Sequence, residues 1–236
     1  YTDADWEQAI KEAEAIDRRE QFVTAFKAPG IFERCHYLMK IEECMMAFYT
    51  NPDEMHDMIK YIMDWEMKWA DMMCEKVHPD CLFHHDDWGT QISTFISPDM
   101  FAEFYLEPYK ELYKFYKDHG VDVIVHHSDS YAETLVPYMI DMGIDIWQGV
   151  MTTNNIPEMI KKYGDKIAFQ GGINSATLDH PGWNKEEIAK EVRRVCTEYG
   201  KKAFIPNLSQ GGDFSTFDGV YEAVSEEIDK MSREMF

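Results

Sequence analysis

The chain has 236 residues, of which 45% are hydrophobic and 14% aromatic, so it can bury one large core and is not a disordered chain. Its 44 acidic and 23 basic residues give a formal charge of -21, which repels phosphate backbones and anionic lipid headgroups and excludes nucleic-acid and membrane-surface roles. No apolar run approaches the roughly 20 residues of a membrane span, and the five cysteines form no CxxC pair, so we expect a cytoplasmic protein in a reducing compartment.

Six short runs rich in β-branched or aromatic residues follow one another along the chain. They are residues 22–28, 81–86, 121–127, 144–148, 166–170 and 202–207. Each is followed by a turn signal and a long helical pattern, which is the alternation of βα units with a parallel sheet. The sequence has no internal repeat or linker. We therefore predict an α/β fold and a single domain over residues 1–236.

Helix start signals stand between the strand runs. Asn51, Asn155 and Asn184 each stand three residues before a glutamate. Ser97 stands directly before a proline. Gly120 and Gly143 stand just before strand runs, where a glycine most easily closes a helix. The helical pattern over about 52–76 places Met55, Ile59, Ile62, Trp69 and Met73 near one face, which we expect to pack against the sheet.

Polar residues collect at the C-terminal ends of these runs, although a strand inside a parallel barrel is expected to be apolar. The second run ends in the sequence His84-His85-Asp86-Asp87, and the third ends in His126-His127-Ser128-Asp129. A single histidine at a strand end is more often structural than a ligand, but several strands end this way. Histidine and aspartate supply both proton-transfer groups and metal ligands. We predict that His85, Asp87, His127 and Asp129 converge on one cavity.

Glycine pairs follow the last two strand runs, at Gly171-Gly172 and Gly211-Gly212. Many barrels bind phosphate through backbone amides at this place. Glycine pairs also form tight turns, so these pairs do not distinguish a phosphate site from a turn.

Several motifs occur in a collinear order that resembles the uroporphyrinogen decarboxylase superfamily. They are DDWGTQ at 86–91, SPDMFAEFYLEPY at 97–109, the turn HSDS at 127–130 and FQGGI at 169–173. The resemblance covers the chain from about residue 22 to its end and implies a TIM (β/α)8 barrel. Residues 22–28 then correspond to the third strand, so that the first two βα units are missing from this chain. We expect this strand to pair with a missing N-terminal segment or with another chain, as in a homodimer, because soluble proteins avoid open strand edges.

The resemblance implies two activities. Decarboxylation of uroporphyrinogen requires arginine and backbone donors for eight carboxylates. The six arginines all fall on predicted helices or their approaches, at Arg18, Arg19, Arg34, Arg193, Arg194 and Arg233. The methyltransferase branch uses zinc, held by an H-x-C turn and a later cysteine, to activate a thiol. Here the turn reads His127-Ser128-Asp129 and 206–209 has no cysteine, so the resemblance implies a harder, less zinc-selective His/Asp site.

We favour methyl transfer from a small methylated substrate to a thiol or to a corrinoid (cobalamin) carried by a partner protein. In this interpretation His127 and Asp129 bind zinc or orient the substrate, and His85, Asp86 and Asp87 supply proton transfer or support. Trp88 and Trp147 form apolar walls. The predicted substrate-binding amides are Gln91, Gln148, Gln170, Asn174, Asn207 and Gln210. The alternatives are a uroporphyrinogen decarboxylase and a non-catalytic barrel that binds a corrinoid or tetrapyrrole; turnover would distinguish the last from either enzyme.

Overall fold

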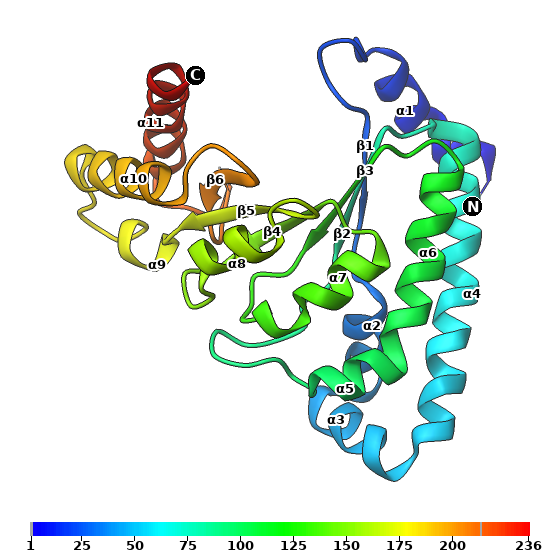
Figure 1. The fold of residues 1–236 in the computed structure, drawn as a ribbon. Helices are drawn as coiled ribbons and strands as arrows, with labels where there is room; N and C mark the ends of the chain where they lie inside the picture. The colour runs from blue at the N-terminus through cyan, green and yellow to red at the C-terminus, as the bar shows by residue number, and fades with distance from the viewer. Residues whose placement is uncertain (1, 213) are drawn as a thin grey trace. The chain divides into compact units, whose positions relative to one another are not determined.

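The computed structural model describes residues 2–212 and 214–236, which form two compact units. The first unit contains the chain up to Trp88 together with Phe95–His127 and Thr134–Asp145, and the second contains Gly89–Thr94, Ser128–Glu133 and Ile146–Phe236. Each unit has three consecutive parallel strands with helices between them (Figure 1). The expectation of a single domain over residues 1–236 stays a prediction.

The first unit holds the strands that carry both His-His pairs. Its elements are α1 (Asp3–Glu14), β1 (Thr24–Lys27), α2 (Ile31–Met39), α3 (Ile41–Thr50), α4 (Pro52–Val77), β2 (Cys81–His85), α5 (Pro98–Phe101), the π-helix η1 (Ala102–Leu106), α6 (Glu107–Asp118), β3 (Val123–His127) and α7 (Val136–Met142), the last preceded by the 3-10 turn η2 (Glu133–Leu135). Strand β2 pairs in parallel with both β1 and β3. The first three strand runs are thus confirmed within two residues at each end.

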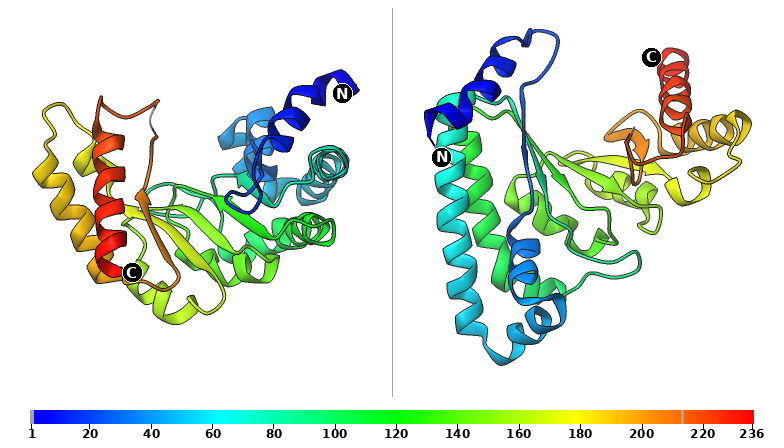
Figure 2. Two further views of the ribbon diagram at one scale, coloured as in Figure 1. Left: turned by 90° about the horizontal axis from the view of Figure 1, so that it is seen from above. Right: turned by 180° about the vertical axis from the view of Figure 1, so that it is seen from behind.

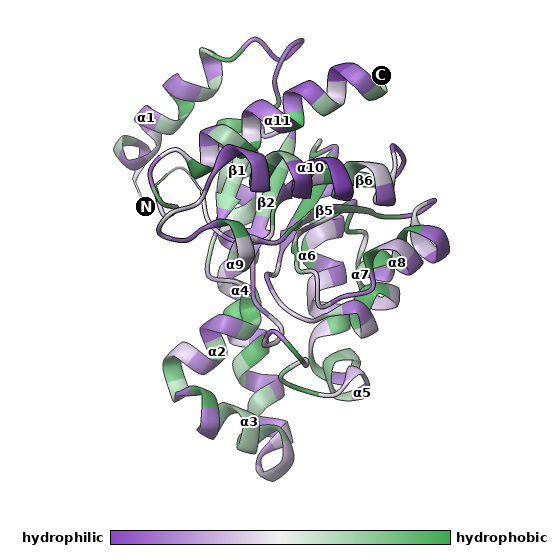
Figure 3. Ribbon diagram, turned by 90° about the vertical axis from the view of Figure 1, so that its left-hand side faces the viewer, coloured by the Kyte–Doolittle hydropathy of each residue, from purple (hydrophilic) through white to green (hydrophobic). Residues whose placement is uncertain are grey.

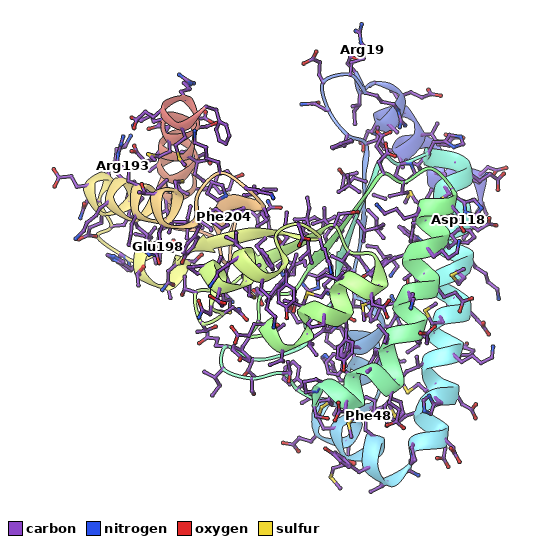
Figure 4. The ribbon with its side chains drawn as sticks, in the orientation of Figure 1. Arg19, Phe48, Asp118, Arg193, Glu198 and Phe204 are labelled. Carbon is purple, nitrogen blue, oxygen red and sulfur yellow. The ribbon has the colours of Figure 1, made fainter. Side chains whose placement is uncertain are left out.

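The second unit contains the last three strands. Its elements are β4 (Ile146–Val150), α8 (Ile156–Tyr163), β5 (Ala168–Ile173), α9 (Ser175–Leu178), α10 (Lys185–Tyr199), β6 (Phe204–Leu208) and α11 (Val220–Met235). Strand β5 pairs in parallel with β4 and with β6, as predicted. Helices α10 and α11 lie side by side (Figure 2). Arg193 on α10 (Figure 4) pairs with Glu227 and Glu234 of α11. Helix α10 is mostly hydrophilic along its length (Figure 3), as expected for an outer helix.

Helix α4 begins at Pro52, where the missing amide of proline costs no helical hydrogen bond. It runs beside α6 (Figure 1), and its buried residues include Met55, Ile59, Ile62 and Met73, as the sequence pattern predicted. The same buried face also carries Glu66, which hydrophobic periodicity did not predict.

Glu66 is buried because two cations meet it inside the first unit. Its Oε1 lies 2.8 Å from Nζ of Lys27, the last residue of β1, and 3.5 Å from the Arg34 guanidinium. The Lys27 ammonium also stands 4.9 Å from the centre of the Trp65 ring. A buried charge requires a partner of this kind, since removing an unpaired ion from water costs several kcal/mol or more, about the stability of a whole domain.

Four tyrosines line the buried side of η1 and α6 at spacings of four, four and three residues. They are Tyr105, Tyr109, Tyr113 and Tyr116. The η1 segment packs against the end of α3, where Phe48 (Figure 4) lies with its ring centre 4.9 Å from that of Phe104. Two of the hydroxyls, those of Tyr109 and Tyr113, contact polar residues at the strand ends.

The predicted helix boundaries are largely confirmed. Ser97 Oγ accepts a hydrogen bond from the Met100 amide at 3.2 Å, and Asn184 Oδ1 accepts one from the Glu187 amide at 2.9 Å. Gly143 closes α7 with a φ of 85°, which glycine adopts most easily. Helices α4 and α8 also begin directly after their predicted asparagines.

The first glycine pair has a packing role. Gly171 has a φ of 147°, and a Cβ at this position would lie 2.6 Å from the carbonyl oxygen of Val150 on the neighbouring strand. The residue therefore lets β5 approach β4 closely at a register shift between Gln148 and Val150.

In the described part of the chain, each helix is too short or too polar to cross a membrane.

Candidate metal centre

The side chains around the end of β2 alternate between two environments. His84 and Asp86 are fully buried, whereas His85 and Asp87 are half-buried. Successive side chains of an extended chain point to opposite faces, so the four polar residues divide into two pairs. His85 and Asp87 share one side of the strand end.

Strand β3 places a second half-buried histidine beside the first. In the parallel register His85 lies opposite His127, and the two imidazole rings stack with centres 4.5 Å apart and planes inclined by 18°. Nε2 of His127 lies 3.9 Å from Oδ1 of Asp87. The structure thus brings together three of the four residues predicted to converge, all within the first unit.

A fourth polar group, Glu33 on α2, contacts this cluster. Its Oε2 lies 2.9 Å from Nδ1 of His85, and its Oε1 accepts a hydrogen bond of 3.0 Å from the Tyr37 hydroxyl one helical turn later. This hydrogen bond to Glu33 raises the pKa of His85 to about 9, although burial acts in the opposite direction. Burial would raise the pKa of Glu33, but the hydrogen bond and charge of His85 outweigh it and lower that pKa.

Asp86 faces away from the cluster and holds the start of α2. Its Oδ2 accepts from the Phe32 amide at 2.9 Å, and its Oδ1 accepts from the Glu33 amide at 2.7 Å. The Trp88 indole and the Tyr109 hydroxyl donate to the same carboxyl group. Burial and the Glu33 charge raise the pKa of Asp86, while these four donors favour its ionised form. Asp86 acts as the acceptor that the unpaired amides at a helix N-terminus require.

The two inner histidines form a buried hydrogen-bonded group. The Tyr113 hydroxyl lies 2.9 Å from Nδ1 of His84 and 2.8 Å from Nδ1 of His126, and the Trp88 ring stacks on His126 with centres 3.8 Å apart. Burial lowers the pKa of both histidines well below the usual value, so both are neutral at physiological pH.

The remaining predicted site residues belong mostly to the second unit. Asp129 is half-buried, and its Oδ2 accepts a hydrogen bond of 3.0 Å from Nε2 of Gln210. Trp147 is fully buried and donates from its indole to the carbonyl oxygen of Ser128 at 2.9 Å. Gln148 lies opposite Gln170 in the register of β4 and β5.

Three predicted binding amides have different surroundings. Asn174 caps α9 by accepting from the Ala176 amide, Asn207 is half-buried on β6, and Gln91 is exposed. Trp88 in the first unit is buried against His126. The binding and catalytic roles assigned to all of these residues stay predictions.

The residues of the cluster fit a divalent metal. His85, Asp87 and His127 each offer one ligand atom, and these atoms all lie within 4.8 Å of one another. Two imidazole nitrogens and one carboxylate oxygen resemble the three-ligand set of catalytic zinc sites and also suit ferrous iron. Among residues 2–212 and 214–236, this is the one group of three or more such side chains with this spacing. The ligand pair first predicted, His127 and Asp129, thus shares only His127 with it.

Sequence reasoning did not find Glu33. It lies on a helix rather than at a strand end, 52 residues before the histidine that it contacts. The only local signal is its place in the first turn of α2. Its role therefore emerges from the tertiary contact alone.

Comparison with known proteins relates this fold to a family. No curated protein matches the sequence. Among solved structures, a methyltransferase from Methanosarcina mazei matches with a TM-score of 0.71 at 16% identity, over 95% of this chain and 64% of that one. The present chain thus spans less than two thirds of that protein, and the likeness shows the fold, a partial TIM barrel. The family model for uroporphyrinogen decarboxylase (URO-D) matches residues 14–226, so the chain belongs to this family.

Proposed function

We propose that this protein is a metal-assisted methyltransferase that moves a methyl group from a small methylated substrate to a thiol or to a corrinoid carried by a partner protein. The cluster of His85, Asp87 and His127 is the observation that carries this proposal. The fold shared with the Methanosarcina mazei methyltransferase supports it at the level of architecture.

In this proposal His85, Asp87 and His127 hold the metal. A zinc ion bound there would lower the pKa of a coordinated thiol and make it nucleophilic near neutral pH. Of the three side chains, only Asp87 carries a negative charge, which neutralises one of the two positive charges of the ion. A site of two nitrogens and one oxygen leaves room for an exogenous ligand, as three-ligand catalytic sites do.

The other polar side chains then orient the substrate. Asp129 and Gln210, joined by their hydrogen bond, offer an acceptor and an amide to a small polar molecule. Gln148 and Gln170 offer further amides from neighbouring strands. These roles depend on the substrate, which we place among small methoxylated or methylamine-type compounds.

Decarboxylation remains the second candidate because the family model bears the name of that enzyme. A substrate with many carboxylates requires cationic donors that are not already paired. Five arginines of this chain already pair with its own carboxylates: Arg18, Arg19, Arg34, Arg193 and Arg194. This pairing favours methyl transfer over decarboxylation.

Metal analysis combined with a transfer assay tests the proposal. The purified protein should contain close to one equivalent of zinc or iron. It should also transfer a methyl group from methoxylated or methylamine compounds to a free corrinoid or to a thiol. The change in corrinoid absorbance measures the first transfer, and the loss of free thiol measures the second. Release of carbon dioxide from uroporphyrinogen without methyl transfer would establish the second candidate instead, and binding of a corrinoid or tetrapyrrole without turnover would support the non-catalytic alternative.

A further inference from the structure

We propose that Glu33 is a positioning residue that orients His85 and selects which of its ring nitrogens binds the metal. The inference rests on the metal centre in the proposed function and extends it to a helix that carries none of the three ligands.

The contact between Glu33 and His85 decides the tautomer of the ring. A carboxylate only accepts hydrogen bonds, so Nδ1 of His85, which is 2.9 Å from Oε2 of Glu33, carries a proton. A metal then binds through the other ring nitrogen, Nε2, and displaces the proton that Nε2 carries in the imidazolium form. Histidine ligands commonly donate their second ring N–H to a carboxylate, which fixes the ring and raises its basicity.

Glu33 is itself held from three directions. Its side chain is only 5% exposed, its Oε1 accepts from Tyr37, and its backbone amide donates to Asp86. Asp86 stands between the ligands His85 and Asp87 in the sequence but points to the other side of the chain. Three consecutive residues therefore act together in this proposal. His85 and Asp87 bind the metal, and Asp86 anchors α2, the helix whose Glu33 orients His85.

A purely structural role of Glu33 would have a different consequence for metal binding. If Glu33 served only to neutralise a buried imidazolium, its loss would change stability and leave the metal affinity of the folded protein unchanged. If it orients His85, its loss weakens metal binding in a protein that is still folded. Metal affinity measured without turnover separates the two.

Cobalt(II) titration of the metal-free protein tests the inference, because the visible spectrum of cobalt reports the ligand geometry. Glu33→Gln keeps an acceptor oxygen and loses the charge, whereas Glu33→Ala removes the acceptor. We expect cobalt affinity to fall by about tenfold in the first variant and about 100-fold in the second, the range typical for partners of metal-bound histidine, with an altered spectrum in the second. Glu43→Gln, an exposed glutamate on α3, is the matched control and should bind like the unchanged protein.

Unfolding midpoints are measured on the same samples, and if Glu33→Ala does not fold, Glu33→Gln decides alone. Unchanged affinity and spectrum in the folded Glu33 variants would overturn the inference while leaving methyl transfer intact. An unchanged protein that binds cobalt but transfers no methyl group would overturn the proposed function, and the effect of Glu33 on affinity would still hold. An unchanged protein that binds no cobalt overturns both.

Discussion

At the scale of single residues, substitution of His127 or Asp129 is expected to affect activity more than stability. Both side chains are half-buried and neither belongs to the apolar core. In the proposed function one binds the metal and the other orients the substrate. A residue in such a role affects rate far more than folding.

We therefore expect His127→Ala and Asp129→Ala each to lower methyl transfer by about 100-fold or more while reducing the free energy of unfolding by about 1 kcal/mol. Turnover with a corrinoid acceptor and thermal midpoints of both variants check this. His119→Ala, at an exposed position after α6, is the control. Rates close to those of the unchanged protein would remove both residues from the mechanism, and equal losses of rate and midpoint would indicate a structural role.

His84 and His126 are expected to make the fold sensitive to mild acid. Burial lowers the pKa of both below the usual value of about 6.5, so the unfolded chain binds more protons than the folded chain once the pH falls below that value. Their contribution to stability is therefore fully present above about pH 6.5 and is lost as the pH falls toward their folded pKa, at about 1.4 kcal/mol per pH unit for each histidine.

Urea unfolding measured between about pH 7 and pH 5.5 should show this loss, since carboxylates with ordinary pKa values contribute little in that range. His126→Gln should reduce the slope of stability against pH, because one of the two buried histidines is gone. His85, whose raised pKa contributes with the opposite sign, is present in both proteins, so the difference between them reports the contribution of His126. A stability that does not change over this range would contradict the assignment of both rings as buried and neutral.

At the scale of elements, one carboxylate joins β2 to α2. Asp86 accepts from the amides of Phe32 and Glu33, and Gly30 leaves space for it, since a Cβ on Gly30 would lie 2.3 Å from Cβ of Asp86. The helix that carries Glu33 is thus positioned by the strand that carries His85.

Asp86→Ala is expected to lower the free energy of unfolding by about 3 kcal/mol, because it leaves buried donors without an acceptor. Chemical denaturation measures this loss. The exposed Asp122→Ala should change stability by no more than about 0.5 kcal/mol. Equal effects of the two substitutions would show that Asp86 does not anchor α2.

At the scale of the whole molecule, the candidate metal centre belongs to one compact unit. His85, Asp87 and His127 all lie in the first unit, which also contains Glu33 and Asp86. Binding of an ion to these ligands should therefore stabilise this unit directly. The formal charge of -21 also favours attraction of a cation over long distances.

Zinc at about 100 times its dissociation constant should stabilise the first unit by about 2.7 kcal/mol. Hydrogen exchange with and without zinc measures this, and we expect added protection at the amides of β2 and β3. A chelator should reverse the effect, and His127→Ala should abolish it. Protection confined to β5 and β6 would place the ion elsewhere.

The sequence alone predicted the six strands, most helix starts and the α/β class. These features depend on local patterns: β-branched runs such as 121–127, the turn at Gly143, and capping asparagines such as Asn184. Local periodicity survives in any context in which one face of an element is buried. The collinear motifs then led to the family, which the match over residues 14–226 confirms.

The candidate site was predicted in part. A cluster of histidines and aspartates at strand ends indicated a mouth of the barrel, and His85, Asp87 and His127 do gather there. The convergence prediction named Asp87 and not Asp86, but the proposed proton-transfer roles included both, because a shift of one residue turns a side chain to the opposite face and the end of a strand is uncertain by more than that.

Only the tertiary structure decided which polar groups meet. Glu33 reaches His85, Glu66 reaches Lys27, and Tyr113 reaches His126 through contacts between different elements. A buried polar residue has no periodic signature, since its burial depends on a partner that the local sequence does not contain. The sequence by itself determined which elements form and in which order, because these depend on local patterns. The packing of α2, α4 and α6 decided which of their charged and polar side chains meet partners on the strands, because those partners are distant in the sequence.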